Sequence, residues 1–443
     1  MKFASTRNPT GEVSFKEAVF RGLAPDGGLY HPVTTPDFRR LLAGFGREPS
    51  TADIGKALTA AFFAPEISPE AAERICRRAF TFEPALVPCD RNISILELFH
   101  GPSCAFKDFG ASFLAAVMEE FLAQESSRAV ILTATSGDTG SAVARAFHKR
   151  ANINVVILYP SGRVSPLQEK QLTTLGGNIT ALEVKGNFDD CQRMVKEAFV
   201  DTKLAQRLRL TSANSINLGR LIPQAFYYVY GWTRLSAAER EKGPVFCVPS
   251  GNFGNLTAGV LAWQWGLPVR RFIAATNANK VVPEYLENGV YSPRPSVHTL
   301  SNAMDVGDPS NFERLQAIFQ KSRDKMSGCI EGVFITDDQT RETIQNVYAE
   351  KGMFLDPHTA LGLTAARLYM ASPAAKAAGL DGAPCITLAT AHPGKFLEVV
   401  EEATGKKPPL PESLAAVLEL PKEAVQVENS GAALKTFLKE RFG

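Results

Sequence analysis

Lys107 stands where the side chain of a lysine could act as a nucleophile. A Gly-Pro pair ends the strand-like run at 93–99, and a helix is expected to begin near Ala105, with apolar residues spaced by four at 109, 113, 117 and 121. The ammonium group would then face the positive end of the helix dipole and lose water on burial, and both effects lower the pKa of a lysine. Such a lysine can form a Schiff base with an aldehyde. A lone lysine more often extends to solvent, so this interpretation depends on its surroundings.

A hydroxyl-rich loop, Thr135-Ser136-Gly137-Asp138-Thr139-Gly140, lies between a predicted strand at 128–134 and a predicted helix at 141–150. Hydroxyl groups and free backbone amides at the start of a helix bind anions. A loop that only caps its helix would have the same composition, so this motif alone leaves both interpretations open.

A glycine-containing loop, Pro249-Ser250-Gly251-Asn252-Phe253-Gly254-Asn255-Leu256, also follows a predicted strand and precedes a predicted helix. Glycines three residues apart allow the backbone to wrap an anionic cluster of oxygens. The chain contains neither a Walker motif nor the dinucleotide-binding glycine pattern. The loop therefore suits a monophosphate.

Thr390 ends another predicted strand, in the run Leu388-Ala389-Thr390-Ala391-His392-Pro393-Gly394-Lys395-Phe396. Its hydroxyl could hydrogen-bond a heteroaromatic nitrogen, whereas His392 precedes a proline, has no metal-spaced partner nearby and is interpreted as structural. A nucleophilic lysine, an anion loop, a phosphate loop and a strand-end hydroxyl are the parts that hold pyridoxal phosphate and an amino acid. Each is weak alone, and their occurrence together predicts that cofactor, with no metal.

Strand-like and helix-like segments alternate through the middle of the chain, which predicts parallel strands joined by right-handed crossovers. Ligands of such sheets bind beyond the carboxyl ends of the strands, where the motifs lie. The first ninety residues predict a mainly helical N-terminal unit, and the last twenty-five, from about Ala416, also look helical. The expected strands are 128–134, 154–159, 179–184, 245–248, 271–276 and 385–390, and the expected helices include 51–63, 69–80, 165–175, 188–208 and 256–265.

Composition argues against several classes of function. The chain has 443 residues, 45% of them hydrophobic, which is enough for two or three packed units. Its net charge is only +2 and it has no long basic run, so nucleic acid or an anionic membrane is not the expected partner. No stretch reaches the roughly 18 apolar residues of a membrane span, and the N-terminus lacks the apolar run of a signal peptide. The seven cysteines are odd in number and scattered, which predicts reduced thiols and a cytoplasmic location.

Six strings, in chain order, resemble the motifs of threonine synthases. They are LELFHGPSCAFKDFG, ATSGDTGSA, SANSINLGR, PSGNFGN, SNAMDVGDPSNF and ATAHPGKF, and the N-terminal STRNP and LAPDGGLYHP agree with them. The resemblance runs from Ser5 to about Phe396 and fits the longer subgroup of the family, which has an extended N-terminal domain. Ser103-Cys104 replaces the commoner pair of threonine and an apolar residue, and Gly394 stands where alanine is frequent; neither is expected to alter the chemistry.

The resemblance implies an α/β fold, that of the fold type II pyridoxal-phosphate enzymes (similar to the tryptophan synthase β subunit). The expected chain then has two parallel-sheet domains and, in addition, a mainly helical N-terminal domain. The implied boundaries are 1–92 for the N-terminal domain, 93–110 with 211–443 for the large cofactor-binding domain, and 111–210 for the small domain. The implied reaction is the last step of threonine biosynthesis: O-phospho-L-homoserine and water give L-threonine and phosphate by γ-elimination and β-addition of water, catalysed by a carbon–oxygen lyase.

The resemblance also implies a role for each motif residue. Lys107 would hold the cofactor as a Schiff base and move protons, and Asp138 stands where many relatives have an asparagine near the cofactor hydroxyl. Thr390 would meet the pyridine nitrogen. The cofactor phosphate would be held by Gly251, Asn252, Phe253, Gly254 and Asn255. The substrate carboxylate would be held by Thr135, Ser136, Gly137 and Thr139. Candidates for the substrate phosphate are Asn214, Ser215, Asn217 and Arg220, because an arginine fork matches phosphate geometry.

Two other functions stay open at this point. A serine or threonine dehydratase-like lyase would need no second phosphate site, so Arg220 with Asn214 and Ser215 favours the synthase. The other alternative is a catalytically silent homologue that binds a small molecule or acts in signalling. Such a protein would not need Lys107 and all four motifs, so their presence argues against it. The expected partner is a small-molecule substrate, with neither nucleic acid nor membrane, and the longer subgroup implies a monomer or a weak homodimer.

Overall fold

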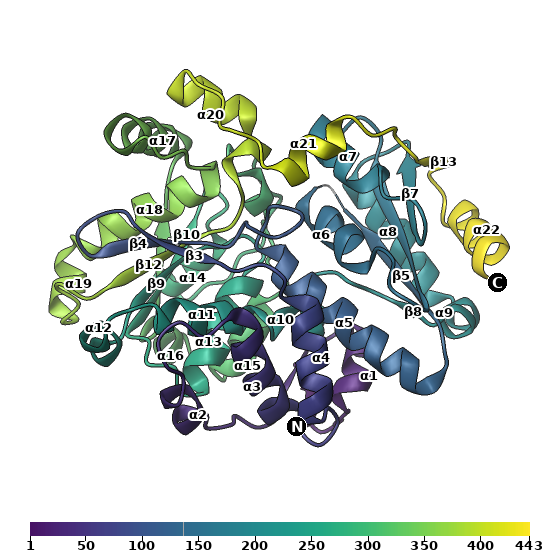
Figure 1. Ribbon diagram of the computed structural model, residues 1–443, viewed down its shortest axis with the longest axis horizontal. Helices are drawn as coiled ribbons and strands as arrows, with labels where there is room; N and C mark the ends of the chain where they lie inside the picture. Colours follow the sequence, from purple (N-terminus) through teal and green to yellow (C-terminus); the bar gives the residue numbers. More distant parts are fainter. Residues whose placement is uncertain (136) are drawn as a thin grey trace.

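Two β-sheets organise the chain in the computed structural model, which describes residues 1–135 and 137–443 (Figure 1). The larger sheet has the strand order β11-β10-β9-β12-β4-β3 and the smaller β13-β7-β6-β5-β8. The larger sheet consists of β11 (Ile330–Phe334), β10 (Arg271–Thr276), β9 (Val245–Pro249), β12 (Cys385–Ala389), β4 (Ile93–Glu97) and β3 (Ala85–Pro88). The smaller consists of β13 (Val425–Val427), β7 (Ile179–Val184), β6 (Ile153–Pro160), β5 (Ala129–Ala134) and β8 (Leu210–Thr211).

Parallel pairing dominates both sheets. Strand β3 pairs antiparallel with β4, and the other pairings of the two sheets are parallel. Strands β5 and β12 are buried along their whole length, as expected for parallel strands covered on both faces. The prediction of an α/β fold with two parallel-sheet units is confirmed.

The N-terminal region is mainly helical, as predicted, with a small two-stranded sheet of β1 (Phe3–Ser5) and β2 (Tyr30–Pro32). Its helices are α1 (Phe15–Arg21), α2 (Arg39–Ala43), α3 (Thr51–Phe63) and α4 (Pro69–Ala79). Helix α3 has the predicted bounds because Ser50 and Asp53 form a capping box at its start. Helix α4 begins after the Ser68 cap with a proline in its first turn.

Helix α5 (Lys107–Glu125) runs between the N-terminal helices and the small sheet (Figure 1). It begins at Lys107, two residues later than predicted, and packs against α4, against α6 (Asp138–Phe147) and against α10 (Leu218–Leu221). The four predicted apolar positions, Phe109, Phe113, Val117 and Phe121, are all buried. Since α5 is covered on several sides, Lys107, its first residue, lies at the edge of an apolar core.

Two predicted elements differ from the structure. The helix expected at 188–208 is two helices, α8 (Phe188–Val200) and α9 (Thr202–Leu208), because Asp201 leaves the helical conformation and its carboxylate accepts a hydrogen bond from Leu204 N. The expectation of an entirely helical C-terminus is wrong as well, because β13 lies between α21 (Glu412–Leu418) and α22 (Gly431–Phe442). Strand β13 has only three residues, which is too short for an alternation of apolar and polar residues to be recognised in the sequence.

The C-terminal segment crosses from the large sheet to the small one (Figure 1). It leaves through α20 (Leu397–Thr404) and α21, which packs on α7 (Pro166–Thr173), and β13 then adds to the edge of the small sheet beside β7. The predicted division assigned these last residues to the large domain, whereas β13 and α22 contact the small unit. Lys422 reinforces the crossing by pairing with Glu169 and Glu183 at 2.8 and 2.9 Å.

The remaining helices surround the large sheet and complete the fold. They are α11 (Gln224–Thr233), α12 (Ala237–Lys242), α13 (Gly254–Gln264), α14 (Val281–Asn288), α15 (Phe312–Ile318), α16 (Arg323–Ser327), α17 (Asp337–Lys351), α18 (Pro357–Met370) and α19 (Pro373–Ala377), with 3₁₀ turns at Asn302–Met304 and Pro393–Lys395. Within 1–135 and 137–443, none of the helices has the length and apolar character needed to cross a membrane.

Candidate active site

Main-chain hydrogen bonds join the loop before Lys107 to the end of β12. The amide of Phe106 donates to the carbonyl of Thr390 at 2.9 Å, and the amide of His392 donates to the carbonyl of Cys104 at 3.0 Å. Lys107 is therefore held beside the strand end that carries Thr390. Parallel-sheet geometry places this junction at the carboxyl edge of the strands, where ligands bind.

Asp108 fixes the shape of the lysine loop. Its carboxylate accepts a hydrogen bond from Ser103 N at 2.9 Å, and a Cβ atom on Gly101 would lie only 2.5 Å from Asp108 Oδ2. Glycine is thus required at position 101. Burial raises the pKa of Asp108 to about 6, so this loop contains a carboxyl group that ionises with difficulty.

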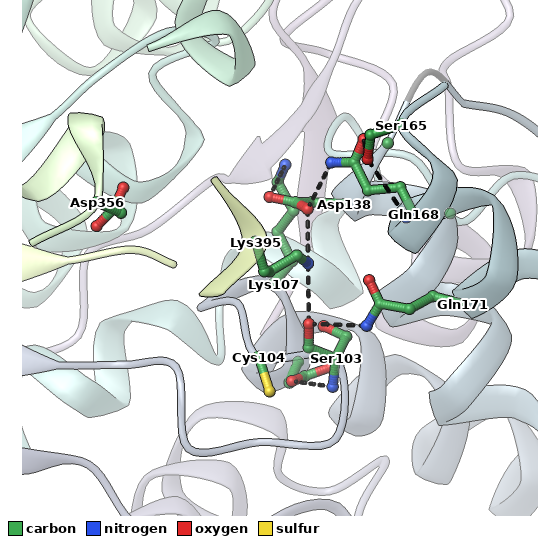
Figure 2. Close-up of polar contacts among 12 residues, drawn as sticks. Ser103, Cys104, Lys107, Asp138, Ser165, Gln168, Gln171, Asp356 and Lys395 are labelled. Atoms are coloured by element: carbon green, nitrogen blue, oxygen red, sulfur yellow. Dashed lines mark hydrogen bonds and ion pairs between the residues drawn. The ribbon is translucent and has the colours of Figure 1, made fainter. Parts of the chain in front are cut away.

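Lys107, Asp138 and Lys395 meet at the centre of the site (Figure 2). Asp138 is the first residue of α6, and its Oδ2 lies 3.9 Å from Lys107 Nζ. Its Oδ1 lies 2.6 Å from Nζ of Lys395 and accepts a 3.2 Å hydrogen bond from Gln168 Nε2. Lys395 also donates to the carbonyl of Ser103 at 2.9 Å. Sequence reasoning gave no role to Lys395 or Gln168, because each acts through a carboxylate far away along the chain.

The electrostatics of this cluster favour an amine at Lys107. Burial lowers the pKa of Lys107, Asp138 opposes this, and the charges of Lys395 and Arg220 lower it further. Burial alone would raise the pKa of Asp138, but the ammonium group of Lys395, which lies 2.6 Å away, holds that pKa below its usual range. The site therefore contains an ionised carboxylate beside a lysine that loses its proton readily.

The loop at 135–140 is held together by the hydroxyl of Thr135. This hydroxyl accepts hydrogen bonds from Gly137 N at 3.1 Å and Gly140 N at 2.9 Å, so it caps α6. Thr139 lies half-buried in the first turn of α6, while Ser136 lies outside the described residues. The capping interpretation holds for Thr135, and binding of a substrate carboxylate by this loop stays a prediction.

In the loop at 249–256, the side-chain amides of Asn252 and Asn255 are engaged within the protein. Asn252 donates to Ser215 Oγ at 2.7 Å and accepts from Ser310 N, and Asn255 donates to Pro249 O at 2.8 Å. Phe253 has a left-handed conformation, with φ of 59°, immediately before α13, which has no side-chain cap. Leu256 N, in the first turn of α13, donates to Asn255 Oδ1 at 2.8 Å, so the amides before it are the ones suited to an anion.

Asn311 points a buried donor at the same helix start. Its Nδ2 has no hydrogen-bond partner among the described residues and lies 3.3 Å from the position that a Cβ atom on Gly254 would take. A buried amide donor without a partner is costly unless a ligand supplies the acceptor. Asn311 lies in the SNAMDVGDPSNF string, but sequence reasoning assigned it no role.

Arg220 is a second buried group suited to an anion. Its Nη1 donates to Ala213 O at 2.7 Å, whereas its Nε has no partner within the described chain. Burial lowers the pKa of Arg220 to about 10. Of its neighbours, Asn217 is committed to main-chain groups, donating to Val19 O and Ser212 O at 2.9 and 2.8 Å, and Asn214 accepts a hydrogen bond from Thr133.

Comparison with known proteins decides the family. Residues 87–382 match the family of pyridoxal-phosphate dependent enzymes, 2–80 the threonine synthase N terminus and 359–438 the threonine synthase C-terminal family. The chain is 41% identical to the threonine synthase of Serratia marcescens and 40% identical to that of Escherichia coli K12, in each case over 99% of both chains. The chain belongs to the threonine synthase family.

Solved structures agree with this assignment. The pyridoxal-phosphate-bound threonine synthase of Brucella melitensis matches with a TM-score of 0.92 at 36% identity, covering 100% of this chain and 99% of that one. The Escherichia coli threonine synthase matches with a TM-score of 0.88 at 40% identity, covering 99% and 100%. Maize serine racemase, at 16% identity and a TM-score of 0.55, shares the fold alone.

As a member of this family, the chain is a pyridoxal-phosphate-dependent lyase, as predicted. The residues present fit the cofactor, because Lys107 offers an amine of lowered pKa to an aldehyde. The uncapped start of α13 and the free amide of Asn311 offer donors to a phosphate. The dehydratase-like alternative is not favoured.

Proposed function

We propose that this chain converts O-phospho-L-homoserine and water into L-threonine and phosphate at the site around Lys107. One observation carries the proposal: besides the lysine, the chain has two separate buried donor groups suited to anions. One is the start of α13 with Asn311, and the other is Arg220, whose charge acts on Lys107. A cofactor phosphate needs one of them, and a phosphorylated substrate needs the second.

Lys107 is proposed to act twice. With the cofactor bound, the amine of Lys107 would hold it through its aldehyde carbon. During turnover the released amine would remove the proton from the α-carbon of the substrate and return it at the end. Bound pyridoxal phosphate supplies an electron-accepting ring that stabilises negative charge beside the substrate nitrogen. Burial keeps Lys107 ready for both roles, because an ammonium group can neither attack a carbonyl nor accept a proton.

Phosphate departure is assigned to Arg220, with Ser215 and Asn214 beside it. A guanidinium with an unused Nε can bind two phosphate oxygens and neutralise the charge that develops as the γ-carbon–oxygen bond breaks. The β-carbon loses a proton as phosphate leaves, the γ-carbon gains a proton to become the methyl group, and water then adds at the β-carbon. The hydroxyl of Thr390 is proposed to meet the pyridine nitrogen, and a hydroxyl there leaves that nitrogen largely unprotonated. The site for the substrate phosphate around Arg220 consequently contributes more to the rate of the reaction.

The remaining roles are also proposals. Gly251, Asn252, Phe253, Gly254 and Asn255 hold the cofactor phosphate mainly through backbone amides, and Asp138 stands near the cofactor hydroxyl. Residues 135–139 complete the substrate site, and Asn217, whose side chain is committed to main-chain groups, shapes the loop that carries Arg220. The domains at 1–92, 93–110 with 211–443, and 111–210 are retained, with 425–443 lying on the small unit.

The seven cysteines are free and buried, which supports the cytoplasm as the compartment. A monomer or weak homodimer is proposed.

Incubation with O-phospho-L-homoserine tests the function. L-Threonine and phosphate should appear in equal amounts and both should vanish in Lys107→Ala. Formation of 2-oxobutyrate and ammonia as the main products would favour a dehydratase instead. Release of phosphate without an amino-acid product other than homoserine would indicate hydrolysis and would contradict the proposal.

A further inference from the structure

Lys395 is the only other lysine that contacts Asp138 within the described residues. We propose that Lys395 is a positioning residue that keeps Lys107 in its amine form by engaging the carboxylate of Asp138. The inference rests on the proposed role of Lys107 as the cofactor lysine and is independent of the identity of the substrate.

Asp138 favours the protonated form of Lys107, and Lys395 opposes this effect. A lone buried carboxylate beside a lysine stabilises the ammonium form, which holds the proton and cannot attack an aldehyde. The distances show which lysine interacts more strongly with the carboxylate of Asp138. Lys395 Nζ lies 2.6 Å from Oδ1, whereas Lys107 Nζ lies 3.9 Å from Oδ2. Coulomb attraction in a buried site increases steeply at the shorter distance.

Lys395 is held in place from two directions. Its side chain has no solvent exposure, and its Nζ donates to the carbonyl of Ser103 at 2.9 Å as well as pairing with Asp138. The same carbonyl accepts from Gln171 Nε2 of α7 at 3.3 Å (Figure 2). The cation therefore cannot swing to solvent, and it joins the turn after β12 to the lysine loop and to the start of α6.

The other charged groups around Lys107 do not replace Lys395. Arg220, on α10, adds positive charge, but its Nη1 donates to Ala213 O rather than to Asp138. Asp108, the next residue after Lys107, is tied to Ser103 N. His358 acts on Asp138 from α18, but its Nδ1 is paired with Asp356 at 2.7 Å. Lys395 is thus the group that neutralises Asp138 directly.

The test is the pH dependence of cofactor capture by the apoenzyme, which needs no substrate. The Lys107 amine adds to the aldehyde carbon of pyridoxal phosphate and water leaves. Borohydride then reduces the new carbon–nitrogen double bond, and peptide mass spectrometry quantifies the adduct on Lys107. In Lys395→Met the capture profile should move to higher pH by about 1–3 units, the effect of changing one buried charge at this range. Lys422→Met, which removes a lysine from a more exposed ion-pair cluster, should leave the profile unchanged.

The double variant Asp138→Asn with Lys395→Met separates charge from folding, because it removes both opposing charges and leaves no unpaired ion. Its profile should return close to that of the parent chain, and Asp138→Asn alone should lie close to the double variant, because Lys395 acts through Asp138. If Lys395→Met fails to fold, Lys395→Gln, which keeps a donor for Ser103 O but loses the charge, takes its place. A Lys395→Gln profile equal to that of the parent chain would overturn the proposal. A slower capture without any pH shift in Lys395→Met would overturn it too. Failure of the parent chain to capture the cofactor on Lys107 would instead contradict the proposed role of Lys107.

Discussion

Arg220 and Arg314 are the two largest fully buried side chains, and they differ in how their guanidinium groups are used. Arg314 donates with all three nitrogens, to Tyr30 O at 2.9 Å, Asn311 Oδ1 at 2.6 Å and Ile216 O at 2.5 Å. Arg220 donates to Ala213 O alone, and its Nε has no partner within residues 1–135 and 137–443. One arginine is committed to the fold, while the other retains donors for a ligand.

Arg220→Lys should lower catalytic efficiency towards O-phospho-L-homoserine about ten- to a hundredfold. Lysine keeps the charge but loses the fork, and a charge-assisted hydrogen bond contributes about 1.5–3 kcal/mol. Any side reaction on unphosphorylated serine or threonine should change much less. Steady-state kinetics on both classes of substrate measure the difference. Equal losses on both would remove Arg220 from the phosphate site.

Arg314→Lys is the matched control for that variant. It should lower the thermal unfolding midpoint, because two or three buried acceptors lose their donors. Its preference for the phosphorylated substrate, per folded molecule, should stay as in the parent chain.

Gly251→Ala should weaken cofactor binding by roughly tenfold or more, which corresponds to about 1.4 kcal/mol. A Cβ atom at position 251 would lie 2.6 Å from Met304 Cα, so the phosphate loop would have to shift. Gly254→Ala is the milder control, because its Cβ would meet only Asn311 Nδ2 at 3.3 Å. Equilibrium dialysis gives the cofactor dissociation constant of each variant. Equal effects of the two substitutions would contradict the assigned geometry.

Asn311→Asp should raise the dissociation constant of the cofactor by roughly tenfold or more, since a carboxylate would replace a donor beside a phosphate. The acceptor for Arg314 Nη1 is retained, so folding should survive. Binding of pyridoxal, which lacks the phosphate, should respond far less. A cofactor affinity equal to that of the parent chain would place the phosphate elsewhere.

Asp108→Asn should stabilise the chain at pH 7 by a few degrees in thermal midpoint and have little effect near pH 4. Burial raises the pKa of Asp108 to about 6, above its ordinary value of 3.8. The folded chain therefore holds this proton between about pH 4 and 6 while the unfolded chain releases it, so the parent loses stability as pH rises through that window. Calorimetry of both chains across this range checks the difference, and a gap between them that does not change with pH would contradict it.

Much of the fold could be predicted from local patterns. The bounds of α3 follow from a capping box, β7 and β10 match their predicted runs, and the buried face of α5 follows from its spacing by fours. The break at Asp201 and the short β13 could not be predicted. One depends on a single residue leaving the helix, and the other depends on an edge that only the folded sheet provides.

The site was predictable only where its residues lie in contiguous motifs. Lys107, the loop at 249–256 and Thr390 each follow a strand end or begin a helix, which is visible in the sequence. The partnership of Lys395 with Asp138 is not visible, because the two residues are brought together by separate sheets. Asn311 was missed for a similar reason: its importance comes from a buried donor without a partner, and burial is known only once the chain has folded.

The central claim is that phosphate leaves by cleavage of the carbon–oxygen bond and that water then supplies the hydroxyl of threonine. Turnover of O-phospho-L-homoserine in ¹⁸O-labelled water, followed by mass spectrometry of both products, tests this most directly. The account predicts one ¹⁸O atom in the hydroxyl of threonine and none in the phosphate, with neither product formed by Lys107→Ala. Label in the phosphate, or threonine without label, would contradict it.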